Sequence, residues 1–384
     1  MYTITMPSQI LHTLFGEDVI TGLSSRIKNS RIAGFLSDRA IKKADASYHD
    51  AFTLGCQGPD IFYHNRHTRP IGLEYGTLLH RRGYGIFSAA LLKMGLPLRN
   101  ENRKNRRKRG MNALGIYALG FMTHALLDRA CHPYIIYKSE GLKITNPNEH
   151  GIYHPFFERI IDVLMLKRLR RQKASSWNQE MLAKACTNPP RGLKKLIARA
   201  LTAAFPERVK QDGKLKQRID NAFTDSGYFY HYSDPVKTSI NIRTIQDEEL
   251  PVSRRFLSIV FPEDLPSDID FLNLSKEPWY YPYQRPDQTR IPDTRSFPDI
   301  YTDAVETAIN TLEPSMTQYL CSGIFPTADA VHTIGNSCLS IQDEEGKPCA
   351  PNCTAPLPLD EVLEEQVRIR GPIPTLTYRN LPEG

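Results

Sequence analysis

The chain has 384 residues, of which 40% are hydrophobic and 24% are charged, and its formal net charge is +7. This composition is ordinary for a globular protein, and the length allows one large or two medium domains with a full core. A membrane-spanning helix is excluded because the longest apolar run, residues 113–137, is interrupted by His124, Asp128, Arg129 and His132.

The amino-terminal sequence Met1–Pro7 has neither the basic nor the apolar region of a signal peptide. The seven cysteines are an odd number and lie far apart, which fits a reducing compartment. We therefore expect a cytoplasmic protein, and secretion would require a different translation start.

Apolar residues at helical spacing predict a mainly α fold. The predicted helices cover about residues 7–28, 73–94, 112–134, 154–171, 193–205 and 299–320. Prolines and tyrosines dominate from about 225 to 300, and Pro, Thr, Asp and Glu accumulate from 326. The prediction is a helical domain over 1–225, an irregular Pro/Tyr-rich extension with one helix packing on the core over 226–325, and a loose tail over 326–384.

Three further segments each leave two interpretations open. The basic block Arg99–Arg109 is interpreted as a solvated loop, with contact to nucleic acid or anionic lipid as the alternative. Aromatic residues around Trp279 are expected to pack on the helices, with peripheral membrane contact as the alternative. Cys338, Cys349 and Cys353 are interpreted as unrelated thiols rather than as a metal clip, because a structural zinc needs four ligands.

Metal-ligand side chains recur at helical spacing in the middle of the chain. His124, Asp128 and His132 lie at i, i+4 and i+8 in an apolar run, so they share one inward face of a helix. His154 and Glu158 repeat this spacing. Buried imidazoles and carboxylates must be satisfied, and a divalent metal does this well. The two motifs predict zinc, and more than one ion.

Two interpretations compete with a catalytic zinc site: a buried hydrogen-bonded His–Asp pair without metal, and a purely structural zinc core. Structural zinc sites are usually closed and rich in sulfur, whereas these ligands are all nitrogen and oxygen. His150 is left unassigned, and five other histidines lack a partner at helical spacing and are not predicted to be ligands: His49, His64, His67, His231 and His332.

The chain resembles the zinc-dependent phospholipase C family, which is related in fold to S1/P1-type nucleases. The resemblance covers about residues 7–165 and is carried by His12, Gly58-Pro59-Asp60, Gly76-x3-His80, His124-x3-Asp128-x3-His132-Pro133-Tyr134 and His154-x3-Glu158. It implies an all-helical domain that holds three zinc ions in a cleft. By this resemblance one zinc is held by Asp60, His80, His124 and Asp128, and another by His132, His154 and Glu158. A third is held by Asp128 and His12, and in secreted members an amino-terminal tryptophan completes it; this chain has no such tryptophan.

These residues predict a zinc-dependent phosphodiester hydrolase, with phospholipase C-type cleavage of a phospholipid as the first hypothesis and two to three zinc ions as cofactor. Asp60 is the predicted catalytic carboxylate that orients the attacking water. One alternative is an S1/P1-like nuclease or nucleotidase, which the basic block favours slightly, although we find no aromatic and basic stripe near the ligands. The other is a non-catalytic zinc-binding or interaction protein that retains the fold.

Overall fold

The computed structural model describes residues 8–27, 46–95, 112–141, 151–234, 257–285, 289–322 and 327–370. Within these ranges every regular element is a helix, and extended pairing is limited to two isolated bridges, Trp279 with Asp293 and Gln342 with Pro348. The predicted mainly α fold class is therefore confirmed. The basic block Arg99–Arg109 and His150 lie outside the described residues.

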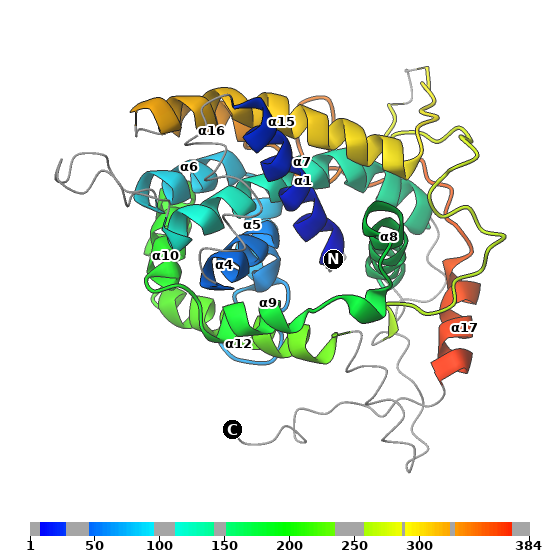
Figure 1. The fold of residues 1–384 in the computed structure, drawn as a ribbon, viewed down its shortest axis with the longest axis horizontal. Helices are drawn as coiled ribbons and strands as arrows, with labels where there is room; N and C mark the ends of the chain where they lie inside the picture. Colours follow the sequence, from blue (N-terminus) through cyan, green and yellow to red (C-terminus); the bar gives the residue numbers. More distant parts are fainter. Residues whose placement is uncertain are drawn as a thin grey trace, which may run out of the picture.

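The described helices form a bundle (Figure 1). In chain order they are α1 (Ile10–Arg26), α4 (Ala46–Cys56), the 3-10 helix η1 (Gly58–Phe62), α5 (Leu73–Arg81), α6 (Tyr84–Gly95), α7 (Ala113–Ser139), α8 (Tyr153–Arg170), the 3-10 helix η4 (Ala174–Ser176), α9 (Glu180–Thr187), α10 (Leu193–Ala204), α11 (Pro206–Lys210), α12 (Leu215–Tyr232), α15 (Phe297–Ser322), α16 (Thr327–Ile334) and α17 (Leu359–Arg370).

Helix α7 is the central element, and it packs against α1, α4, α6, α8 and α15. It begins where the sequence predicts, because the side chain of Asn112 accepts a hydrogen bond from the Gly115 N–H at 2.9 Å and caps the helix. The helix continues through Pro133 to Ser139, beyond the predicted end, since burial of Tyr134 and the residues after it offsets the hydrogen bond that proline cannot make.

The predicted helix over 73–94 is two helices, so the prediction is wrong at this point. Helix α5 ends at Arg81, and Gly83 adopts a positive φ of 76°, which favours glycine and turns the chain into α6. The N–H of Gly83 donates to the Asn336 carbonyl at 3.2 Å, and that of Gly85 to the Gly335 carbonyl at 2.9 Å. The start of α6 therefore packs against Gly335 and Asn336, which lie some 250 residues further along the chain.

The crossing of α4 and α7 depends on two facing glycines. A Cβ atom on Gly120 would lie 2.4 Å from the Phe52 carbonyl oxygen, and one on Gly55 would lie 2.2 Å from that of Tyr117. We expect Gly120→Ala to lower the free energy of unfolding by about 1–3 kcal/mol, because the added methyl group meets backbone that cannot move aside. Denaturant unfolding of the two proteins measures the difference.

Gly213 provides the matched control, because a Cβ atom there has no heavy atom within 4 Å. We expect Gly213→Ala to change the free energy of unfolding by no more than about 0.5 kcal/mol. Equal effects of the two substitutions would contradict the close backbone approach of α4 and α7.

The part of the chain beyond α12 packs on the same core as the amino-terminal helices. The largest hydrophobic cluster includes Phe297, Leu339 and Leu363 together with residues of α1 and α7. The prediction of a loose tail from 326 therefore fails for residues 327–370, since two helices form there and Ile334 of α16 and Leu363 of α17 are buried. The predicted boundary at 225/226 falls inside α12, and the division into domains otherwise stays a prediction.

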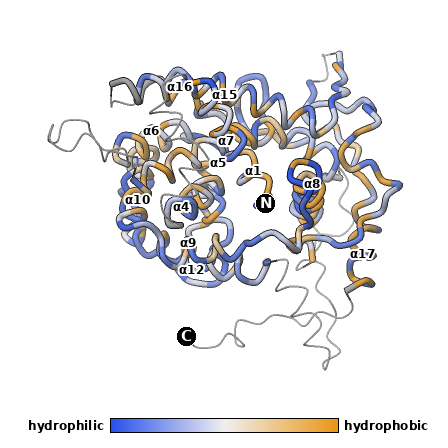
Figure 2. Tube along the Cα trace, in the orientation of Figure 1, coloured by the Kyte–Doolittle hydropathy of each residue, from blue (hydrophilic) through white to orange (hydrophobic). Residues whose placement is uncertain are grey.

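The aromatic stretch packs inward, as the favoured interpretation predicts. Trp279 is 4% exposed, and its ring lies 5.4 Å from that of Tyr134 and 6.2 Å from that of Tyr137. Figure 2 shows that the start of α1, which lies in the interior, carries hydrophobic residues, whereas α12, which lies at the edge, is mostly hydrophilic. None of the described helices combines the length and the apolar content that crossing a membrane requires.

Candidate metal centre

Five helical elements bring the eight predicted metal ligands together in the interior. His12 comes from α1, Asp60 from η1 and His80 from α5, while α7 contributes three ligands and α8 two. The Gly58-Pro59 pair produces the tight turn that presents Asp60: Gly58 has a φ of 57°, and a Cβ atom there would lie 2.4 Å from the His124 ring. All eight residues are at most 8% exposed: His12, Asp60, His80, His124, Asp128, His132, His154 and Glu158.

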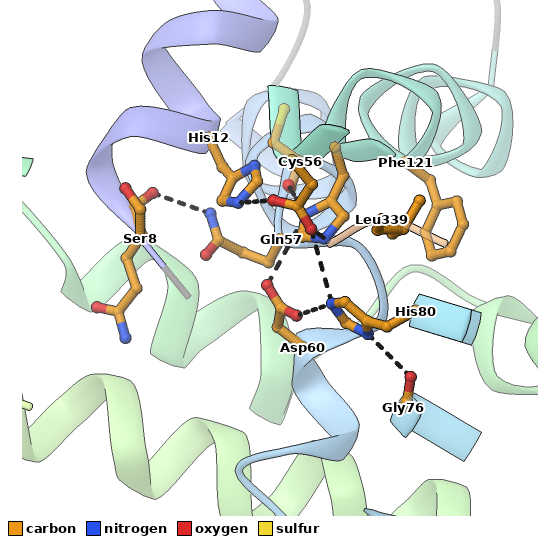
Figure 3. Close-up of polar contacts among 12 residues, drawn as sticks. Ser8, His12, Cys56, Gln57, Asp60, Gly76, His80, Phe121 and Leu339 are labelled. Atoms are coloured by element: carbon orange, nitrogen blue, oxygen red, sulfur yellow. Dashed lines mark hydrogen bonds and ion pairs between the residues drawn. The ribbon is translucent and has the colours of Figure 1, made fainter. Parts of the chain in front are cut away.

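Asp128 is the carboxylate around which the first histidines gather. Its Oδ2 lies 3.1 Å from His124 Nε2, and its Oδ1 lies 3.2 Å from His12 Nε2. His80 Nε2 lies 3.7 Å from Asp128 Oδ2 and 3.1 Å from Asp60 Oδ1 (Figure 3). One aspartate is therefore shared between histidines of three different helices.

Glu158 is the centre of a second group on α7 and α8. Its Oε1 lies 3.4 Å from His132 Nε2 and 3.3 Å from His154 Nε2. The groups are neighbours, because His132 Nδ1 is 3.9 Å from Asp128 Oδ2. Three sets have ligand atoms within 4.8 Å of one another: His12 with Asp60 and His124; His80 with His124 and Asp128; and His132 with His154 and Glu158.

Four histidines are oriented by an acceptor behind the ring. The Nδ1 atoms of His80, His124 and His132 lie 2.9 Å, 3.1 Å and 2.9 Å from the carbonyl oxygens of Gly76, Cys56 and Leu339. His154 Nδ1 lies 3.3 Å from Glu140 Oε1. An Nδ1–H that donates outward leaves the Nε2 lone pair directed into the cluster, which is how metal-binding histidines are held.

The donor set fits zinc better than a network of hydrogen bonds alone. Several buried atoms that face the cluster have no hydrogen-bond partner, among them both oxygens of Asp60, Nε2 of His124 and His154, Oδ2 of Asp128 and Oε2 of Glu158. Leaving such atoms unsatisfied is costly, whereas zinc takes imidazole nitrogen and carboxylate oxygen in sites of this kind. The residues present therefore fit a metal centre with more than one ion.

The pKa values of Asp60 and Asp128 are shifted in opposite directions. Burial raises the pKa of Asp60 well above its usual range; the charges of Asp128 and Glu158 act in the same direction, and those of His124 and His132 oppose it. Burial also opposes ionisation of Asp128, but the neighbouring His124, His132 and His12 hold its pKa well below the usual range. Asp60 is therefore the better proton acceptor of the two.

Stability of the zinc-free protein is expected to fall at alkaline pH. Burial opposes protonation of His132, but the Asp128 charge and the hydrogen bond and charge of Glu158 raise its pKa from 6.5 to about 10. Glu158 and Glu140 likewise raise the pKa of His154 to about 9 despite its burial. Because both pKa values lie above the unfolded value, the stabilisation is complete below pH ~6.5 and is lost as pH rises through ~9 to ~10.

Thermal unfolding of the chelator-treated protein between about pH 7 and pH 10 measures this loss. In His132→Asn the fall in Tm should be smaller, because one of the two histidines that share Glu158 no longer titrates. An unchanged Tm across this range in the zinc-free protein would contradict the raised pKa values.

Residues outside the predicted ligand set support the centre. Arg129 donates to the carbonyl oxygens of Ile334, Gly335, Ser337 and Cys338 and so holds the segment that carries Leu339. The Leu339 N–H also donates to the His80 carbonyl at 2.8 Å. The role of this segment could not be predicted from the sequence, because any residue provides a backbone carbonyl that can accept a hydrogen bond.

Asp162 supports the centre from α8 and was also missed. Its carboxylate accepts hydrogen bonds from the Ser8 hydroxyl and from the N–H groups of Gln9 and Leu11, so it caps α1 and fixes the helix that carries His12. A sequence signal for it exists, since Asp162 continues the spacing of His154 and Glu158 by four more residues.

The histidines not predicted as ligands lie outside the three metal-ligand sets. His49 Nε2 is 3.7 Å from Glu17, His231 Nδ1 is 3.2 Å from Glu180, and His332 is exposed on α16. His67 is held by its N–H, which donates to Asp225 at 2.9 Å. Among the described residues no cysteine belongs to a metal-ligand set, and the interpretation of Cys338, Cys349 and Cys353 as unrelated thiols stays a prediction.

The fold and the site define an all-helical protein with a cluster of histidine and carboxylate groups that suits several metal ions. Residues 15–207, just over half of the chain, match the family model for zinc dependent phospholipase C. The chain therefore belongs to the zinc-dependent phospholipase C family. His12 and the 334–341 segment lie outside the matched residues. Comparisons with curated proteins and with solved structures find no match.

Proposed function

We propose that the chain is a zinc-dependent phosphodiester hydrolase that cleaves a phospholipid on the diacylglycerol side of its phosphate. The observation that carries this proposal is the meeting of three ligand sets, two of which share His124, within one buried cluster. Adjacent cations suit a substrate whose reacting group is an anionic phosphate. Family membership supports the same substrate class.

The proposed ligand assignment is the one that the family resemblance implies, and only its second group coincides with one of the three ligand sets. Asp60, His80, His124 and Asp128 would hold one ion, and His132, His154 and Glu158 another. Asp128 and His12, which approach to 3.2 Å, would hold a third. When bound, zinc supplies Lewis acidity that lowers the pKa of a water molecule and neutralises charge on the phosphate.

Asp60 is the proposed catalytic carboxylate. Its Oδ1 lies 3.1 Å from His80 Nε2, whereas Asp128 contacts His12, His80 and His124 and would be shared between ions, which makes Asp128 the weaker acceptor for the proton of the attacking water. The Asp60 N–H donates to the Gln57 carbonyl at 3.2 Å, and its carbonyl accepts from the Tyr63 N–H at 2.8 Å, so the turn holds the carboxylate in place. Asp60 would thus orient the water and accept its proton.

Hydrolysis of phospholipid vesicles by the zinc-restored protein tests the proposal. We expect release of phosphorylated headgroup together with diacylglycerol, abolished by a chelator and restored by zinc. Asp60→Asn should lower kcat by about 10²–10⁴-fold, the range of a positioned general base. Absence of headgroup release from every common phospholipid class would contradict the lipase function.

The same preparation separates the two alternatives. Chelator-sensitive cleavage of single-stranded DNA that exceeds lipid hydrolysis would favour the nuclease. Zinc uptake without turnover of any phosphodiester would favour a non-catalytic binding protein.

A further inference from the structure

Several polar side chains that are not proposed metal ligands are buried with unused hydrogen-bonding atoms, and three of them are His64, Tyr230 and Gln9. His64 has no partner for either ring nitrogen, Tyr230 none for its hydroxyl, and Gln9 none for its amide nitrogen or oxygen. Their exposed fractions are 4%, 0% and 1%. Buried polar atoms are nearly always hydrogen-bonded, so these atoms call for a ligand or for water.

His64 and Tyr230 lie together beside the Asp60 turn. The backbone N–H of His64 donates to the backbone carbonyl of Asp60 at 3.3 Å, which places His64 one turn after Asp60. The rings of His64 and Tyr230 meet edge to face at 5.2 Å, and Phe229 stacks on the His64 ring at 3.9 Å. Helix α12 is fixed here by the Ser226 hydroxyl, which donates to the Ile61 carbonyl at 2.9 Å.

Gln9 approaches the same turn from α1. Its carbonyl accepts a hydrogen bond from Gln57 Nε2 at 3.1 Å, and Gln57 in turn accepts from the Asp60 N–H. Figure 3 shows Gln57 between the start of α1 at Ser8 and Asp60. The Gln9 N–H donates to Asp162 at 3.0 Å, so the backbone of Gln9 is held on both sides.

The three groups are an imidazole, a phenol and a primary amide, each of which can both donate and accept a hydrogen bond. Their unused atoms include both ring nitrogens of His64, the Tyr230 hydroxyl and both amide atoms of Gln9. Hydroxyl groups also both donate and accept, so they suit these side chains, whereas a quaternary ammonium group can form no hydrogen bond with them.

We propose that His64, Tyr230 and Gln9 form a subsite for the hydroxyl groups of an uncharged polyol headgroup, such as glycerol or inositol, whose phosphate lies at the metal centre. The assignment rests on the proposed function and narrows its substrate class. Hydroxyl groups would supply the missing partners of the three side chains, and the stacked His64 ring would fix their positions. A site built to bind hydroxyls discriminates strongly against ligands that lack them.

The test compares vesicles of phosphatidylinositol, phosphatidylglycerol and phosphatidylcholine as substrates of the zinc-loaded protein. We expect kcat/KM to be at least about tenfold higher for the polyol lipids than for phosphatidylcholine. Tyr230→Phe removes only the hydroxyl and should lower kcat/KM for the polyol lipids by about tenfold, with a smaller loss for phosphatidylcholine. His64→Phe keeps the stacked ring and should act in the same direction.

Tyr228→Phe is the matched control, because Tyr228 lies on the same helix and is 40% exposed. Zinc content is measured in every variant to separate loss of the subsite from loss of the metal centre. Equal losses on all lipids, or a wild-type preference for phosphatidylcholine, would overturn the subsite and leave the proposed hydrolase intact.

Binding tests the subsite even if no lipid is hydrolysed. Calorimetry with inositol 1-phosphate, glycerol 3-phosphate and phosphocholine should show tighter binding of the two polyol phosphates, and Tyr230→Phe should remove that preference. Unchanged binding and turnover in Tyr230→Phe and His64→Phe would mean that buried water alone satisfies these atoms, and would overturn the proposal.

Discussion

Asp128→Asn is expected to lose bound zinc and hydrolytic activity together, by at least about a hundredfold in activity. Asp128 lies within 3.2 Å of both His12 and His124 and within 3.9 Å of His80 and His132, so one carboxylate lies close to histidines of all three ligand sets. An amide keeps the shape of the side chain but cannot offer two anionic oxygens to neighbouring cations. Metal analysis and turnover of the same preparation measure both losses.

His231→Ala provides the control for Asp128→Asn. The His231 side chain is 43% exposed and pairs with Glu180 rather than with the cluster, so its removal should change neither zinc content nor activity appreciably. Similar losses in the two variants would show that the site has been misplaced. Full zinc content in Asp128→Asn would contradict a shared carboxylate.

Arg129→Met is expected to weaken zinc binding by about 10–100-fold and to destabilise the protein, although Arg129 is not a proposed ligand. Its guanidinium donates to four carbonyl groups between Ile334 and Cys338 and so holds Leu339 against His132. Methionine preserves much of the side-chain volume but leaves those carbonyls without their donors. We expect the free energy of unfolding to fall by about 2–4 kcal/mol.

Zinc titration of Arg129→Met, compared with Arg168→Met on the exposed side of α8, separates this effect from general loss of an arginine. Arg168→Met should bind zinc as the wild type does. If Arg129→Met is destabilised but binds zinc with unchanged affinity, residues 334–341 do not orient the ligands, and their role is only structural.

The sequence was sufficient to predict the helical fold and the ligand face of α7. Spacing of four residues is visible without a structure, because His124, Asp128 and His132 must share one face of any helix that contains them. The predicted ends were less accurate where tertiary packing outweighs local preference, as at Pro133, which lies inside α7, and at Gly83, which divides the helix predicted over 73–94.

The support of the centre could not be predicted, because it depends on contacts between distant parts of the chain. Leu339 reaches His132 across 207 residues, and it does so with a backbone carbonyl that any residue would provide. A Pro- and Thr-rich composition led to the prediction of a loose tail, whereas residues 327–370 bury Leu339 and Leu363 in the core. Composition describes the average polarity of a segment and carries no information about which of its residues are buried.

His64 shows what spacing along the sequence does not reveal. Its lack of a partner at helical spacing removed it from the candidate ligands, and the three ligand sets indeed leave it out. Its place four residues after Asp60 is visible in the sequence and suggests that it lines the pocket, but its contact with Tyr230, from a helix more than 150 residues away, is not. Spacing identifies side chains that share one helix, whereas side chains contributed by different helices become visible only in the folded chain.

Metal content of the purified, full-length protein, measured by mass spectrometry without added zinc, tests the central claim most directly. Two or three zinc ions per chain are expected, since three ligand sets share one buried cluster. A chain that contains no zinc and takes up none when zinc is added would contradict the metal centre and with it the proposed hydrolase.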